Sequence, residues 1–125
     1  MLDPTRAYLV RDERIAGYPR SAPFHPSTRY PESPFSEIGS EPNGAYDLVR
    51  ALFQHMGLDG ERFGTPGWNP LGELIAPGAT VVLKPNLVSH MNYGFRDGIT
   101  DTDSLVTHGS IIRAVADYVA IALAG

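Results

Sequence analysis

The sequence predicts an α/β fold, with a partial parallel, Rossmann-like, three-layer sheet, helices, and a long irregular Pro/Gly-rich N-terminal arm. Three observations lead to this prediction. The continuous apolar run at 81–83 is typical of a strand covered on both faces. Two segments with helical patterning alternate with strand candidates along the chain. Glycine and proline supply 13 and 11 of the 125 residues, which requires long stretches of turn and loop.

The composition excludes several functional classes. With 42% hydrophobic and 19% charged residues, the chain has the balance of a globular protein. We expect no membrane partner and a cytoplasmic location, because no apolar run reaches the ~20 residues of a spanning helix and the start lacks a signal-peptide pattern. A net charge of -4 argues against nucleic-acid binding. The absence of cysteine excludes disulfides and thiolate sites within these residues.

Residues 1–76 are interpreted as an N-terminal extension that opens with a strand candidate at 7–10. Residues 17–42 then carry six of the eleven prolines, a density that neither a helix nor a sheet ladder tolerates. Four aromatic rings are spaced among these prolines. They favour an arm packed on a surface over a solvated linker, and they are Tyr18, Phe24, Tyr30 and Phe35.

An amphipathic helix over 44–57 is the clearest local prediction. Asn43 is a suitable N-cap, and Gly57 supplies a left-handed residue after which Leu58 can fold back on Phe53. Arg50 falls on the outer face. Apolar residues at helical spacing predict a core stripe that covers a sheet, and they are Ala45, Leu48, Val49, Leu52, Phe53 and Met56.

Residues 60–78 form a second Gly/Pro-rich connection. Asn69-Pro70 is typical of a helix start, so we predict one or two helical turns over 71–75. We expect Trp68 to anchor this connection to the core.

Residues 77–125 are interpreted as the first β–α unit of a larger sheet. The strand at 81–83 ends at Lys84, a long loop follows from about 89 to 105, and a helix begins near Thr107 as its N-cap. This helix is so apolar that it must be buried on more than one side. Because two strands are not stable alone in water, we expect the remainder of the same protein, or a second subunit, to complete the sheet.

The candidate site lies where that strand ends and that helix begins. Pro85 keeps Lys84 extended, so the side chains of Lys84 and Asn86 project to one face. Ligands of open α/β sheets bind at such strand ends, beside helix N-termini that favour anions. We expect a small anion to bind here. The catalytic candidates are Lys84, Asn86 and His108. The candidates for binding are Thr107, Gly109, Ser110 and Arg113.

The competing interpretation of these residues is structural. Thr107 would then only cap the helix, Arg113 would only pair with Asp117, and Lys84 would only extend into solvent.

The loop before the last helix carries His90 and three aspartates, namely Asp97, Asp101 and Asp103. Alternate carboxylates at 101 and 103 could bind Mg²⁺ or Ca²⁺, but aspartates in glycine-rich loops are usually turn formers. We therefore predict no metal and no cofactor. The sequence contains no GxSxG, P-loop, GxGxxG or HExxH motif.

Two strings resemble the domain of unknown function 362 family. They are PGATVVLKPNLV at 77–88 and THGSIIRAV at 107–115, and together they extend the resemblance over about 77–125. The family's Lys-Pro-Asn falls on residues 84–86 and its helix-opening Thr on Thr107. The resemblance implies a bacterial or archaeal α/β protein whose relatives are sometimes fused to iron–sulfur modules. The chain departs from it in His108-Gly109, where relatives often have Asp-Pro or His-Pro, and in having no cysteine.

The function stays open between classes at this point, and so does the question of whether the protein is an enzyme. The leading hypothesis is the N-terminal part of an enzyme-like α/β domain that binds a small anionic substrate, with the reaction unknown. The alternatives are a non-catalytic assembly module, in which the arm at 17–42 packs onto a partner subunit, and a redox-linked domain if an iron–sulfur module follows.

Overall fold

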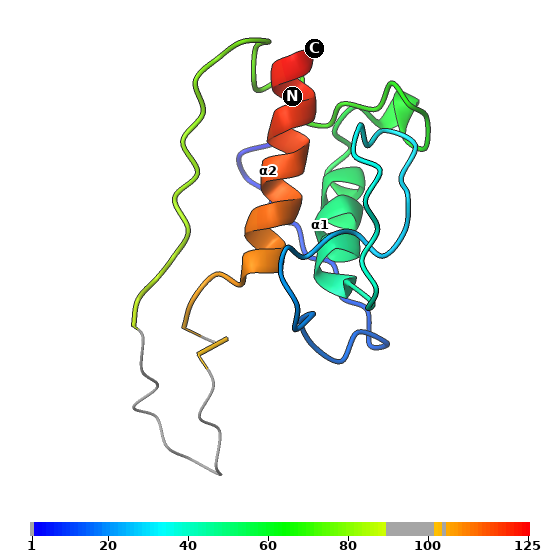
Figure 1. The fold of residues 1–125 in the computed structure, drawn as a ribbon. Helices are drawn as coiled ribbons and strands as arrows, with labels where there is room; N and C mark the ends of the chain where they lie inside the picture. The colour runs from blue at the N-terminus through cyan, green and yellow to red at the C-terminus, as the bar shows by residue number, and fades with distance from the viewer. Residues whose placement is uncertain (1, 90–101, 104) are drawn as a thin grey trace.

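A computed structural model describes residues 2–89, 102–103 and 105–125. Helix α1 spans Gly44–His55, the short 3-10 helix η1 spans Gly60–Arg62, and helix α2 spans Gly109–Ala124. Helices α1 and α2 lie side by side, and extended segments and turns wrap around the pair (Figure 1). No helix in this described part is long and apolar enough to cross a membrane.

The predicted parallel, Rossmann-like, three-layer sheet is wrong for the residues that the structure describes. Their only ladder contact is an isolated antiparallel bridge between Leu87 and Val106. Residues 7–10 lie beside α1, where the Tyr8 ring meets His55 at 5.9 Å, and 81–83 run beside α2 (Figure 1). A strand needs a neighbouring strand about 4.8 Å away in the hydrogen-bonding direction. Among the described residues neither segment has one, and each packs its side chains on a helix instead. Both segments therefore remain extended chain, and the core is a helix pair.

Helix α1 begins at Gly44 as predicted and ends at His55, two residues before the predicted bound, with the predicted form of C-terminal turn. The Asn43 side chain accepts a hydrogen bond from the Tyr46 N–H at 3.1 Å. Gly57 has a φ of +74°, and the Leu58 N–H donates to the Phe53 carbonyl at 3.2 Å, which completes the Schellman pattern. The expected cover for the apolar face is wrong, because α1 packs against α2 and not against a sheet.

The core lies where α1, α2 and the connection between them meet. Trp68 anchors this connection as predicted, since it is completely buried and its Nε1 donates to the Leu58 carbonyl at 2.9 Å. Its ring meets Phe63 and Tyr118 edge-on, with centroids 4.9 Å and 5.6 Å away. The buried residues of the core cluster are Tyr46, Val49, Leu58, Trp68, Leu71, Ala114, Tyr118, Val119 and Ala122.

The proline-rich arm packs on the helices of its own chain, as its rings predict. Tyr18 stacks on the His108 ring with centroids 4.3 Å apart, and Phe24 meets the same ring at 5.1 Å. Tyr30 stacks on Tyr46 of α1 at 6.0 Å. These rings therefore pack within the chain, although Tyr18 keeps 41% of its surface exposed.

A buried ion pair fastens the arm to both helices. Glu32, only 5% exposed, accepts from Arg50 Nε at 2.6 Å and from the Tyr118 hydroxyl at 2.8 Å. The Arg50 guanidinium also lies 4.3 Å from the centroid of the Tyr30 ring. The prediction that Arg50 faces solvent is wrong, because the arm covers that face of α1.

A second polar cluster ties α2 to α1 and to the arm. Asp117 accepts from Arg113 Nε at 2.8 Å, the predicted pairing, and from the Tyr46 hydroxyl at 2.9 Å. Arg113 Nη1 also donates to the Pro23 carbonyl at 3.2 Å. Burial, and then the charge of Asp117, raises the pKa of Tyr46 well above its ordinary value.

Candidate functional site

The predicted strand end and the start of α2 lie in direct contact. The Asn86 N–H donates to the Thr107 hydroxyl at 3.0 Å, and the Thr107 N–H donates to the Asn86 carbonyl at 2.8 Å. The bridge between Leu87 and Val106 continues this contact by one residue on each side. Two segments 21 residues apart in the sequence are thus joined at the point where the site was predicted.

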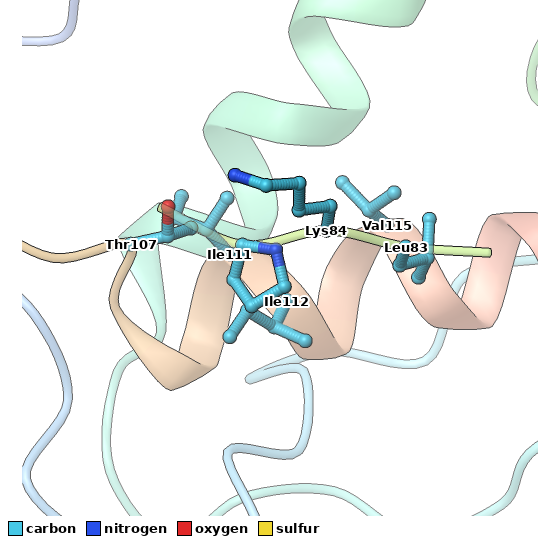
Figure 2. A pocket seen from close by; sticks show the side chains of 7 residues that line it. Leu83, Lys84, Thr107, Ile111, Ile112 and Val115 are labelled. Carbon is cyan, nitrogen blue, oxygen red and sulfur yellow. The ribbon is translucent and has the colours of Figure 1, made fainter. Parts of the chain in front are cut away.

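A small pocket lies between this extended segment and α2 (Figure 2). Its volume is about 140 Å³, and aliphatic side chains make most of its wall. The Lys84 side chain is exposed and extends along the pocket toward its Thr107 end (Figure 2). The lining residues are Leu83, Lys84, Pro85, Thr107, Ile111, Ile112 and Val115.

Lys84 has no ion-pair partner among the residues that the structure describes. The Thr107 hydroxyl accepts from the Asn86 backbone, and its own O–H has no acceptor among the residues that the structure places. The pocket therefore offers one ammonium group and one hydroxyl donor beside an apolar wall.

His108, and not Thr107, is the N-cap of α2. Its Nδ1 accepts from the Ser110 N–H at 3.2 Å, and its ring is held in the stack with Tyr18. The sequence misplaced the cap by one residue because the Thr107 hydroxyl is taken by the Asn86 backbone. His108 is thus engaged with the arm and is not among the residues that line the pocket.

The other candidates at the helix start also face the arm or the interior. Ser110 is completely buried. A Cβ at Gly109 would lie 2.5 Å from Phe24 Cε2, so the absence of a side chain there makes room for a ring of the arm and not for a ligand. Arg113 is held by Asp117 and by the Pro23 carbonyl. The structure therefore brings Lys84, Asn86 and Thr107 together, and separates the remaining candidates from the pocket.

The possible cation site in the loop lies largely outside the described residues. His90, Asp97 and Asp101 fall in the undescribed part, and only Asp103 is placed. Within the placed residues, no three His, Cys, Asp or Glu side chains gather as a metal site.

Sequence reasoning missed a larger hollow of about 490 Å³ between the arm and the start of α1. Its charged lining residues are Arg14, Arg20 and Asp47. Arg14 is held by Asp12, and this hydrogen bond lowers the pKa of Asp12 to about 2. No signal in the sequence marks the hollow, because it depends on where an irregular arm crosses α1.

No family model, curated protein or solved structure matches this chain, which leaves its resemblance to the domain of unknown function 362 family neither supported nor refuted.

Proposed function

We propose that this chain binds a small organic anion with an apolar body in the pocket between Lys84 and α2. The observation that carries the proposal is that the Lys84 ammonium group lies beside an aliphatic wall and has no ion-pair partner among the described residues. A carboxylate at Lys84 and Thr107, with its hydrocarbon part on Ile111 and Val115, matches both features. The Asn86 backbone is bonded to Thr107 at the same end of the pocket, and in this proposal the Asn86 side chain orients the ligand.

The pocket limits both the size and the affinity of this ligand. A volume of about 140 Å³ takes about five non-hydrogen atoms, at about 30 Å³ each. Each buried methylene contributes about 0.8 kcal/mol, and an exposed ion pair contributes about 0–1 kcal/mol. For a ligand with three apolar carbons the total is about 3 kcal/mol, which corresponds to a Kd of about 6 mM. Butyrate is a suitable probe.

The experiment titrates butyrate and butanol into the whole chain and follows backbone and methyl NMR shifts. We expect butyrate to shift the Ile111, Ile112 and Val115 signals, and to bind more tightly than butanol. Lys84→Ala should weaken butyrate about fivefold, which is about 1 kcal/mol, while Lys84→Arg keeps the charge and the affinity. Arg11→Ala removes a cation from an exposed pair that precedes the arm and does not line the pocket, and it serves as the matched control. Equal binding of butyrate and butanol, or unchanged affinity in Lys84→Ala, would contradict the proposal.

A second proposed function concerns a polypeptide partner. We propose that the remainder of the same protein, or a second subunit, covers the extended segment at 82–88. Val82, Leu87 and Val88 are 85%, 67% and 69% exposed, and clustered apolar exposure of this kind marks interaction surfaces. Hydrogen exchange of this segment, compared between the isolated chain and the assembled protein, tests the proposal. Equal exchange in both states would overturn it.

A further inference from the structure

Residues 80–84 carry a row of backbone groups that no described residue pairs. On one side the Ala79 N–H donates to the Ala76 carbonyl, and on the other the Asn86 N–H donates to Thr107. Between these points, no hydrogen bond from any described residue reaches the N–H or C=O groups of 80–84. An extended segment with free donors and acceptors is a template on which another strand can pair.

The side chains of residues 81–83 alternate as they do in a strand. Val81 packs against the core cluster, and Leu83 lines the pocket over α2 together with Lys84 and Pro85. Val82 points away and is 85% exposed, and Asn86 is exposed as well. The segment runs beside α2 on the side away from α1 (Figure 1). One face is therefore covered by a helix, and the outer edge is open to an added strand.

Charge distinguishes the possible occupants of this edge. Lys84 is the only charged residue between positions 74 and 89. A second copy of the same segment would bring another lysine and no carboxylate, on a chain that already carries a formal charge of -4. A strand with a glutamate opposite Lys84 would instead form a cross-strand ion pair, which contributes about 0.2–1 kcal/mol.

We infer that residues 80–84 are a docking edge for an extended peptide of different sequence, which adds a β-strand there. Its backbone pairs with the free groups of 80–84, its alternate apolar side chains extend the layer over α2, and one carboxylate faces Lys84. This inference rests on the second proposed function and names the chemistry of the partner.

The test uses the whole chain and a fluorescent peptide, Thr-Val-Glu-Val-Thr-Val. We expect saturable binding by anisotropy, together with at least tenfold slower hydrogen exchange at 80–84. Replacing the peptide's Glu by Lys should weaken binding up to about fivefold, and Lys84→Glu should reverse this preference. N-methylation of alternate peptide nitrogens should abolish binding, because it removes the donors of the added strand.

Two variants at one position separate backbone pairing from apolar contact. Val82→Pro removes one N–H and should abolish binding, whereas Val82→Thr keeps the N–H and the β-branched shape and should retain it. The helical circular dichroism signal of each variant checks that α1 and α2 remain folded. Binding that survives Val82→Pro, or equal binding of the Glu and Lys peptides, would overturn the inference.

The same exchange measurement separates this inference from the broader proposal. Protection of 80–84 that appears without peptide and grows with protein concentration would identify a second copy as the occupant. That result would overturn the inference but would still support the second proposed function, in which a polypeptide covers residues 82–88. Fast exchange at 80–84 in the assembled protein, with no peptide binding, would overturn both.

Discussion

Removal of the Glu32 carboxylate tests how strongly the arm stabilises the helix pair. The carboxylate accepts two hydrogen bonds from Arg50, at 2.6 and 3.2 Å, and one from Tyr118 at 2.8 Å. In Glu32→Ala the guanidinium stays charged at 15% exposure without its partner, and the Tyr118 hydroxyl loses its acceptor. Breaking a buried pair from one side costs about 3–5 kcal/mol. The ring of Tyr30 still faces the guanidinium, so we expect a loss of about 3 kcal/mol in the free energy of unfolding.

Urea unfolding followed by the helical circular dichroism signal measures this loss. The control is Glu13→Ala, because Glu13 pairs with Arg11 at 3.4 Å with both side chains mostly exposed, and its removal should cost less than about 0.5 kcal/mol. Glu32→Gln keeps an acceptor oxygen and should fall between the two. If Glu32→Ala and Glu13→Ala lose the same free energy, the arm does not stabilise the helices through this pair.

Two further predictions concern the same interface. Gly109→Ala should destabilise the fold by about 1–3 kcal/mol, because its Cβ would meet the Phe24 ring at 2.5 Å, whereas Gly60→Ala has open space and should cost far less in the same urea assay. The pKa values of Tyr46 and Tyr118 are raised by burial and then by neighbouring carboxylates, so their contribution is complete below pH 10 and is lost as pH rises further. For each of these two tyrosines, the free energy of unfolding should fall by up to about 1.4 kcal/mol per pH unit above pH 10. The rise in tyrosinate absorbance from these two residues should coincide with loss of the helical circular dichroism signal. Ionisation of these two residues near pH 10 with the helices intact would contradict the prediction.

The features predicted correctly from the sequence are those decided by neighbours along the chain. The cap at Asn43 and the Schellman turn at Gly57 depend on side chains and dihedral angles within five residues. The pairing of Arg113 with Asp117 follows from helical spacing. The packed arm and the buried Trp68 were also predicted, because aromatic rings are costly to leave in water.

The features that the sequence did not predict depend on partners far along the chain. The run at 81–83 has the composition of a strand, but its neighbour is α2, and composition does not identify a neighbour. Arg50 falls on the polar side of its helix, yet Glu32 from the arm buries it. The candidate site residues are separated for the same reason. The His108 ring stacks on Tyr18 of the arm, and only Lys84, Asn86 and Thr107 lie together.

Trp68 gives the molecule a built-in optical reporter. It is the single tryptophan of the chain, and it is buried. Its indole contacts Phe63 of the connection, the Leu58 carbonyl after the end of α1, and Tyr118 of α2. Emission from this one ring should shift to longer wavelength when any of the three contacts opens. Excitation of the adjacent Tyr118, 5.6 Å away, should be transferred to it in the folded state and fade on unfolding, so that unlabelled protein reports its own packing.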